Sequence, residues 1–347
     1  SFIASFNDID GTYIPFDRPG PTHRTDQLTE FLDRYHALRI AVSGRDRSLI
    51  ARGQKGGSTY EEEHIPPFHS EGNAVGTEIW VLQNDGSYEQ DAEWDRILRQ
   101  DYNFNREGIY TLCTEMLTEL PPELKQSNLI FQDRDSKDNV EAHTIKSLDE
   151  AAEQPRFLPP QDFKISFYFQ GNQATAELMY EQFKKTLDAH GFEKVKIVVS
   201  HSEELENGTI LYNLDLIPVT KKDAINYMKK TYGVLATVAG DSGNDADMLF
   251  NSDAEISIIP YGSKEELVST IETVKKSAKR IIKETNHILM YEDQNGKVRI
   301  LLTELERYNG TSEDKGPRSV ETLLRAAGRI SKHYFDRNGR KVEDSDQ

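Results

Sequence analysis

Short apolar runs alternate with amphipathic stretches at both ends of the chain, a pattern typical of β–α units around a mostly parallel sheet. The predicted strands are residues 2–6, 39–43, 74–82, 235–239 and 256–259. The predicted helices, in which apolar residues recur every three or four positions, are residues 25–38, 221–230 and 263–280. The two ends of the chain therefore predict one α/β domain with helices on both faces of a parallel sheet.

The middle of the chain has a different pattern. Residues 163–169 alternate apolar and polar side chains, as in a strand with one buried face, so the Phe stripe there is a core feature. Strands at 194–200 and 209–217 flank a polar turn, and helices are predicted at 94–98, 109–120 and 174–190. We expect an α+β domain inserted into the first one. The expected boundaries are 1–84 with 218–310 for the core, 85–217 for the insertion, and 311–347 for a helix (320–334) and charged tail.

Composition and charge narrow the function classes. With 42 basic against 59 acidic residues, the net charge of −17 argues against nucleic-acid binding and against an anionic membrane surface. Cys113 is the only cysteine, which excludes an intramolecular disulfide and a cysteine-rich zinc site. The 347 residues contain no apolar run of the roughly 20 residues that a membrane span needs. We expect a soluble, cytoplasmic protein that acts on a small molecule as a monomer or weak homodimer.

The first candidate site follows the first predicted strand. Asp8 and Asp10 lie two residues apart in the sequence Asp-Ile-Asp-Gly-Thr, at the strand end where open α/β sheets bind ligands. Gly11 lets the turn tighten, and Thr12 can hydrogen-bond within it. Taken alone, the segment is also consistent with an ordinary turn.

A second acidic turn follows the strand at 235–239. Its sequence, Gly-Asp-Ser-Gly-Asn-Asp, supplies Asp241 and Asp245 at a comparable strand end. Four carboxyl groups crowded together raise each other's pKa values unless a cation compensates. Oxygen ligands without paired histidine or cysteine favour Mg²⁺ over zinc.

Two further segments add hydrogen-bond donors and positive charge. Ser43 and Gly44 end the second predicted strand, where a hydroxyl and free N–H groups can hold an anion. Lys221 opens a helix and can neutralise a phosphoryl oxygen. Taken alone, a serine at a strand end is usually a cap, and a lysine at a helix start is usually solvated surface.

In this order, the four segments resemble the motifs of the haloacid dehalogenase superfamily of phosphotransferases, with an α+β cap of type C2 inserted between the second and third motifs. The likeness narrows to the sucrose-phosphate phosphatases, whose conserved segments are similar to residues 74–80, 163–167, 214–218 and 240–245, and it covers roughly residues 1–260. The loop at 53–69, which carries His64 and His69 and which we interpret as exposed rather than metal-binding, is longer than this resemblance leads us to expect. Lys222 replaces the glycine that often follows the motif lysine, and the tail beyond residue 309 has no counterpart.

The resemblance implies a Mg²⁺-dependent phosphatase acting on sucrose 6-phosphate or a related hexose or disaccharide phosphate. Asp8 would be the nucleophile that forms an aspartyl-phosphate, and Asp10 the general acid and base. Mg²⁺ would be held by the Asp8 carboxylate, the Asp10 backbone carbonyl, Asp241 and Asp245. The residues implied for the phosphoryl group are Ser43, Gly44, Lys221 and Asn244. The candidates for sugar hydroxyl contacts, which are as consistent with packing, are Thr77, Glu78 and Lys164.

Two other function classes stay open. Phosphomannomutases share the Asp-x-Asp-Gly-Thr segment and a related cap, so a phosphosugar mutase is one alternative. A non-catalytic sugar-phosphate-binding protein on the same scaffold is the other, although the intact Asp8, Asp10, Ser43, Lys221 and Asp241 argue against it.

Overall fold

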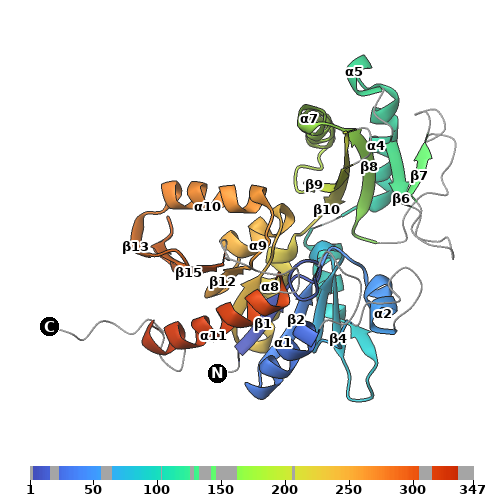
Figure 1. Cartoon of the computed structure of the whole chain (residues 1–347). Coiled ribbons are helices and arrows are strands. Elements are labelled where there is room, and N and C mark those ends of the chain that lie inside the picture. Colours follow the sequence, from blue (N-terminus) through green and yellow to red (C-terminus); the bar gives the residue numbers. More distant parts are fainter. Residues whose placement is uncertain are drawn as a thin grey trace. The chain divides into compact units, whose positions relative to one another are not determined.

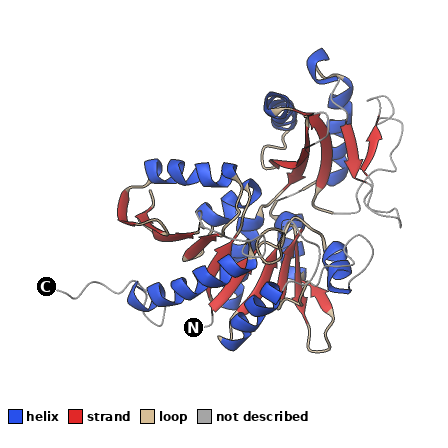
Figure 2. Ribbon diagram, in the orientation of Figure 1, coloured by secondary structure: helices blue, strands red, loops and turns tan. Residues whose placement is uncertain are grey.

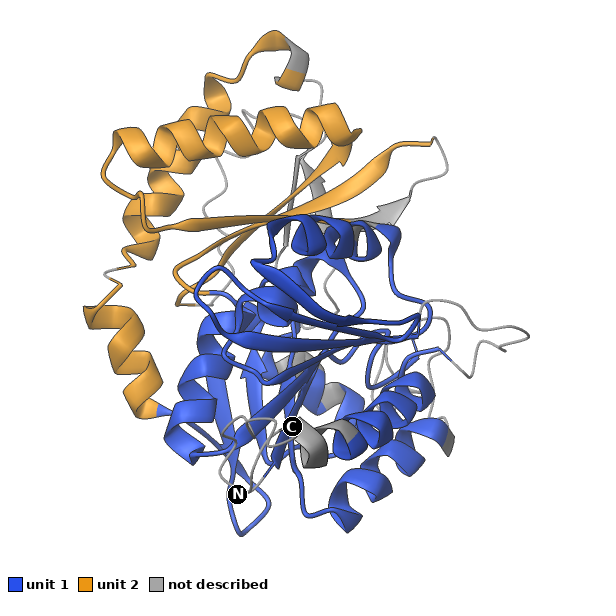
Figure 3. Ribbon diagram, turned by 90° about the vertical axis from the view of Figure 1, so that its left-hand side faces the viewer, with its two compact units in different colours: residues 1–91, 220–347 blue, residues 92–219 orange. Residues whose placement is uncertain are grey.

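The computed structural model describes residues 3–15, 23–55, 65–102, 104–125, 129–132, 142–145, 162–204, 208–304 and 315–334. The chain divides into two compact units: unit 1 comprises Ser1–Asp91 with Thr220–Gln347, and unit 2 comprises Ala92–Val219 (Figure 3). No helix of the described residues is both long and apolar enough to cross a membrane.

Unit 1 is built on a ten-stranded sheet (Figures 1 and 2). The strand order is β13 (Arg280–Glu284), β14 (Ile288–Glu292), β15 (Val298–Thr303), β12 (Ile256–Ile259), β11 (Leu235–Ala239), β1 (Ile3–Asn7), β2 (Leu38–Val42), β3 (Ser70–Asn73), β4 (Glu78–Leu82) and β5 (Tyr88–Gln90). From β15 to β3 all neighbours are parallel, and both edges are antiparallel. The register sets Phe6 of β1 beside Val238 of β11 and Ile40 of β2, so these strands end at the same edge.

Helices cover both faces of this sheet. On one face, α1 (His23–Arg34) and α11 (Pro317–Tyr334) lie side by side, and their apolar side chains share one core cluster with the strands (Figure 1). On the other face lie α8 (Lys221–Tyr232) and α9 (Ala246–Asn251). The remaining helices of unit 1 are α2 (Arg47–Lys55), α10 (Glu265–Ser277) and the short 3₁₀ turns η2 (Ala74–Gly76) and η4 (Gly243–Asp245). The predicted α/β core is therefore confirmed.

Unit 2 is an antiparallel sheet packed on helices. The strand order is β7 (Ala142–Ile145), β6 (Leu129–Gln132), β8 (Ile165–Gly171), β10 (Ile210–Ile217) and β9 (Lys196–Glu204). Its helices among the described residues are α3 (Ala92–Gln100), α4 (Arg106–Thr118), α5 (Pro122–Lys125) and α7 (Gln173–Ala189). Ile165, Phe167 and Phe169 enter one core cluster with α4 and α7, so the Phe stripe is buried core as predicted. The inserted segment is an α+β unit.

The unit boundaries differ from those expected. The first core segment runs to Asp91 rather than residue 84, because β5 pairs with β4 and keeps the chain in the core sheet. The core resumes at Thr220 rather than 218. The expected separate C-terminal segment is wrong for its helix, because Val320 and Leu323 of α11 are buried in the core of unit 1.

Two further expected elements also differ. The strand expected over 74–82 starts only at Glu78, because Ala74 and Val75 have φ of 49° and 65° and form the η2 turn. The loop expected over 53–69 is helical in its first residues, within α2, and Ile65 and Phe68 are buried. His64 lies outside the described residues. His69 accepts a hydrogen bond from the Arg39 backbone N–H at its Nδ1.

Candidate active site

The site lies where β1 and β11 end. Asp8 directly follows β1, and its N–H donates to the carbonyl of Ala239, the last residue of β11, at 2.9 Å. The chain then turns back, with the Ile14 N–H donating to the Ile9 carbonyl at 2.9 Å. Gly11 has φ +73° in this turn, a conformation that side-chain-bearing residues rarely adopt. The parallel register of β1 and β11 thus brings the two acidic turns of the sequence to one place.

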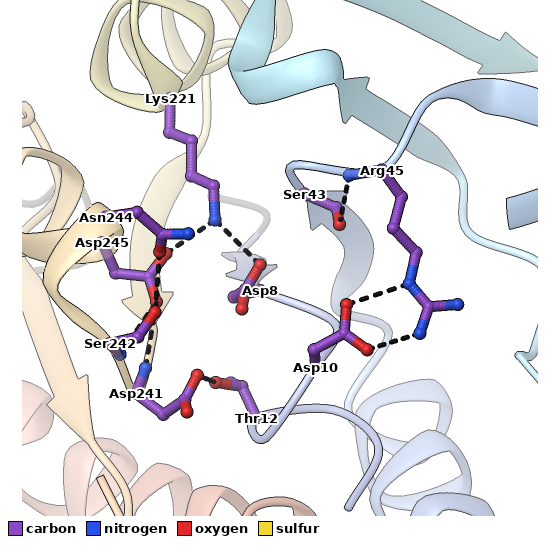
Figure 4. A network of polar contacts seen from close by, with 10 residues as sticks. All are labelled: Asp8, Asp10, Thr12, Ser43, Arg45, Lys221, Asp241, Ser242, Asn244 and Asp245. Atoms are coloured by element: carbon purple, nitrogen blue, oxygen red, sulfur yellow. Dashed lines mark hydrogen bonds and ion pairs between the residues drawn. The ribbon is translucent and has the colours of Figure 1, made fainter. Parts of the chain in front are cut away.

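Three carboxyl groups and one ammonium group converge there. Asp8, Asp241 and Asp245 each place an oxygen within 4.8 Å of the others. Nζ of Lys221 donates to Asp8 Oδ1 at 2.8 Å and to Asp245 Oδ1 at 2.7 Å (Figure 4). All four residues are at most 5% exposed. With one positive and three potential negative charges, the cluster is short of positive charge.

That shortage shows in the pKa values. Burial raises the pKa of Asp8 well above its usual range; Asp245, Asp241 and Asp10 raise it further, against the opposing effect of Lys221. Burial and then the charge of Asp245 raise the pKa of Asp241 to about 7. Burial alone would lower the pKa of Lys221, but Asp245 and Asp8 outweigh it and keep the ammonium protonated.

The donor set fits a hard divalent cation. The three converging groups are carboxylates, the ligands that Mg²⁺ prefers, and no histidine or cysteine joins them among the described residues. Of the three carboxylates, Asp245 accepts the most hydrogen bonds. Its Oδ2 accepts from the N–H groups of Asp241 and Ser242 at 3.1 and 3.2 Å, while its Oδ1 is taken by Lys221. Asp8 and Asp241 are therefore the better candidates for direct ligands.

The start of helix α8 fixes the position of Lys221. It is the first residue of α8, and Thr220 and Asp223 form a capping box there, with the Thr220 N–H donating to Asp223 Oδ2 at 2.8 Å. Thr220 Oγ1 also donates to Asp247 Oδ2 at 2.6 Å. These bonds fix the helix end from which the lysine extends.

Asp10 stands apart from the carboxylate cluster. Its side chain is turned away and forms a bidentate ion pair with Arg45, with Nε of Arg45 2.9 Å from Oδ2 (Figure 4). Ser43 is fully buried at the end of β2, and its Oγ accepts from the Arg45 N–H at 3.1 Å. Arg45 is a residue that sequence reasoning missed, although it directly follows the Ser-Gly pair that drew attention to this strand end.

The other two residues predicted to bind the phosphoryl group are Gly44 and Asn244. Gly44 has no neighbouring atom within 4 Å of the position a Cβ would take. Asn244 lies in the η4 turn, is exposed, and accepts a hydrogen bond from Ser242 Oγ at 2.7 Å (Figure 4). Thr12 carries a bond that the sequence did not predict: its Oγ1 donates to Asp241 Oδ1 at 3.2 Å.

The three candidates for sugar contacts have partners of their own. Thr77 is buried, and its Oγ1 donates to the Ala74 carbonyl at 2.9 Å. Glu78 accepts from Trp80 Nε1 at 3.2 Å. In unit 2, Lys164 is buried in an ion pair with Asp215, with 3.1 Å between Nζ and Oδ2.

Comparison with known proteins assigns the family. The family model described as sucrose-6F-phosphate phosphohydrolase matches residues 109–289, more than half of the chain. That range contains Lys221, Asp241 and Asp245, while Asp8, Asp10 and Ser43 precede it. No curated protein matches the sequence.

Solved structures with a related arrangement are distant in sequence. A haloacid dehalogenase-like hydrolase from Bacillus subtilis is 16% identical with a TM-score of 0.48, covering 93% of this chain and 91% of its own. A phosphatase of the haloalkanoate superfamily from Bacteroides thetaiotaomicron is 13% identical with a TM-score of 0.47, over 77% and 87%. A subclass IIB sugar phosphatase is 14% identical with a TM-score of 0.43, over 77% and 90%. At these sequence identities and TM-scores, the similarities carry no information about function.

An α/β core with an inserted α+β unit and the matched family model together define a phosphatase of the haloacid dehalogenase superfamily, a phosphoric monoester hydrolase. Within it, the chain belongs to the sucrose-6F-phosphate phosphohydrolase family.

Proposed function

We propose that the protein is a Mg²⁺-dependent phosphatase that hydrolyses sucrose 6-phosphate or a related hexose or disaccharide phosphate through an aspartyl-phosphate on Asp8. The observation that carries this proposal is the buried cluster of Asp8, Asp241 and Asp245 around the Lys221 ammonium at the ends of β1 and β11. The family to which the chain belongs supports the class of substrate.

In the proposed reaction, a carboxylate oxygen of Asp8 attacks phosphorus, and the bond from phosphorus to the sugar oxygen breaks. Asp10 gives its proton to that sugar oxygen and then takes a proton from the water that attacks the aspartyl-phosphate. Inorganic phosphate leaves and the Asp8 carboxylate is regenerated. Lys221 and Ser43 are the proposed donors to the phosphoryl oxygens, where fixed donors stabilise the charge that develops in the transition state.

The metal would be held by the carboxylates of Asp8, Asp241 and Asp245 and by the Asp10 carbonyl. Bound there, Mg²⁺ would supply the missing positive charge, which keeps Asp8 ionised and neutralises the phosphoryl group. The raised pKa values of Asp8 and Asp241 support this assignment, because burial and neighbouring carboxylates disfavour their ionised forms and a bound cation would offset both effects.

Sugar recognition is proposed for the polar face of the unit 2 sheet. Lys164 pairs with Asp215, whose Oδ1 accepts from Ser166 Oγ at 2.6 Å and whose Oδ2 accepts from Asn213 Nδ2 at 3.1 Å. Ser166 alternates along β8 with the core residues Ile165 and Phe167, so it lies on the face opposite the helices. Such linked donors and acceptors suit sugar hydroxyl groups. Thr77 and Glu78 of unit 1 stay candidates for the same role.

The test is phosphate release from a panel of sugar phosphates, including sucrose 6-phosphate, with Mg²⁺ and with chelator. We expect metal-dependent turnover that Asp8→Asn reduces by roughly 10³-fold or more, because the covalent step is lost. Asp91→Asn, in unit 1 but outside the cluster, is the control and should retain activity. No release from any member despite Mg²⁺ binding would contradict the proposal and favour a phosphosugar mutase or a binding protein.

A further inference from the structure

The start of α11 is held tightly against the loop that follows β12. Gly316 directly precedes the helix, with φ +70°, and its N–H donates to the Tyr261 carbonyl at 3.3 Å. Ser319 is fully buried; its Oγ accepts from the Tyr261 N–H at 2.8 Å and donates to Glu304 at 2.6 Å. This helix end is therefore fixed from behind.

In front of it lies the backbone of the Asp8–Thr12 turn. A Cβ on Gly316 would stand 2.8 Å from the Gly11 carbonyl oxygen, 3.1 Å from its carbon and 3.3 Å from the Thr12 carbonyl oxygen. These neighbours are backbone atoms, which cannot move aside as a flexible side chain can. Glycine is thus required at 316 both by the positive φ and by the close approach.

The opposite side of the same turn contacts Asp241. Thr12 Oγ1 donates to Asp241 Oδ1 at 3.2 Å (Figure 4). A Cβ on Gly11 would overlap the Asp241 carboxylate, at 2.7 Å from its Cγ. The backbone of Gly11 and Thr12 therefore lies close to Gly316, and the same two residues lie close to the Asp241 carboxylate.

The packing around this contact is also rigid. Ile9 and Tyr13 of the turn and Val320 and Leu323 of α11 are all at most 4% exposed and belong to one core cluster. Because close-packed interiors transmit displacements, a shift of the helix end moves the turn rather than being absorbed.

We propose that Gly316 is a positioning residue for the reaction. It sets where the Asp8–Thr12 turn stands, and through Thr12 it sets where the Asp241 carboxylate stands. The start of α11 is thereby part of the active-site framework, although it lies about 70 positions from the nearest acidic motif. This inference rests on the proposed roles of Asp8 and Asp241.

The test compares Gly316→Ala with Gly86→Ala. Gly86 lies in the turn between β4 and β5 with φ +84° and has nothing within 4 Å of a Cβ, so its substitution introduces the backbone strain without the overlap. Both variants should lose similar stability from strain. Only Gly316→Ala should lower kcat, by roughly tenfold or more, and weaken Mg²⁺ binding measured by calorimetry, because the turn is displaced.

Two more measurements separate positioning from general damage. Hydrogen exchange of the amides of residues 9–14 should accelerate in Gly316→Ala and not in Gly86→Ala. Thr12→Val combined with Gly316→Ala should lower kcat by less than the product of the single effects, because both act on Asp241. If Gly316→Ala does not fold, Ser319→Ala, which loosens the same helix end without overlap, should shift the same readouts less strongly.

Equal exchange, kcat and Mg²⁺ affinity in Gly316→Ala and Gly86→Ala would overturn the inference. If the wild-type protein released no phosphate from any substrate, the proposed function would fail, while hydrogen exchange would still decide whether Gly316 holds the turn.

Discussion

When no cation is bound, the ionised Asp241 carboxylate destabilises the folded protein. Its pKa is about 7 in the folded chain against 3.8 for a free side chain, so the folded protein binds more protons than the unfolded one between these values. The free energy of unfolding therefore falls as pH rises from about 4 to about 7. At about 1.4 kcal/mol per unit, the loss is about 4 kcal/mol.

We predict that Asp241→Asn, in the presence of chelator, is more stable than wild type at pH 7.5 by up to about 4 kcal/mol, and by only about 1 kcal/mol at pH 4.5. The amide cannot ionise, so it avoids first the cost of burying a charge and then the repulsion from Asp245. Urea unfolding at the two pH values measures this, and saturating Mg²⁺ should reverse the order because the amide is the weaker ligand. Equal stability of the two proteins at both pH values would contradict the pKa assignment.

Arg45 supplies a prediction about Asp10. Its bidentate ion pair orients the proposed acid and base. We expect Arg45→Gln to slow phosphate release from a sugar phosphate by about 10²-fold, and much less from p-nitrophenyl phosphate, whose leaving group needs no proton. Arg34→Gln, on the exposed surface of α1, is the control. An equal loss on both substrates would argue against a role in proton transfer.

The sequence predicts the carboxylates of the site better than their partners. Asp8 and Asp241 follow apolar strands, and parallel strands end at one edge of a sheet, so their proximity could be inferred without coordinates. The hydrogen-bond partners of Asp10 and Thr12 could not be inferred in this way. Arg45 pairs with Asp10, and Asp241 with Thr12, through loop geometry that no local sequence pattern encodes.

At the scale of elements, burial explains several of the matches and misses between sequence and structure. The predicted strands 235–239 and 256–259 match β11 and β12 because both are mostly apolar and almost entirely buried. β3 was missed because its sequence is Ser-Glu-Gly-Asn, with Glu71 buried beside Arg47. β13 was missed because all of its residues are exposed, so no face shows an apolar pattern. In η2, apolar residues suggested a strand, but positive φ values are invisible in composition.

The η2 turn also supports the helix that carries Lys221. Gly76 has φ +93°, and a Cβ there would stand 2.8 Å from the carbonyl oxygen of Thr220, the N-cap of α8. We predict that Gly76→Ala lowers the free energy of unfolding by about 2 kcal/mol or more and reduces turnover. Gly233→Ala, at the other end of α8 with φ +63° and open space, should cost about 1 kcal/mol and leave turnover unchanged. Urea unfolding and phosphate release measure both effects, and equal behaviour of the two variants would contradict this coupling.

At the scale of the whole molecule, the change of pattern in the middle third predicts the insertion, but not its limits. Strand β5 is polar and lies where the pattern changes, so its membership of the core sheet depends on its pairing with β4 rather than on composition. The C-terminal helix was assigned to a separate segment because it follows a polar stretch, whereas its apolar face completes the core over α1.

The two units can be followed separately because each contains one of the two tryptophans. Trp80 lies on β4 of unit 1, and Trp94 is buried on α3 of unit 2. Asp8, Asp241, Asp245 and Lys221 all belong to unit 1, so a cation bound to them should stabilise unit 1 alone. At one hundred times its dissociation constant, that stabilisation is about 2.7 kcal/mol.

We therefore predict that Mg²⁺ shifts the urea transition reported by Trp80 in Trp94→Phe, and leaves that reported by Trp94 in Trp80→Phe unchanged. Phe167→Ala should do the reverse, lowering only the Trp94 transition by about 3–5 kcal/mol, because Phe167 is 1% exposed within the unit 2 core. Fluorescence of the single-tryptophan variants during urea unfolding, with and without Mg²⁺, measures all four transitions. If Mg²⁺ and Phe167→Ala each moved both transitions equally, the chain would unfold as one cooperative body, and stability in unit 2 would depend on the metal site of unit 1.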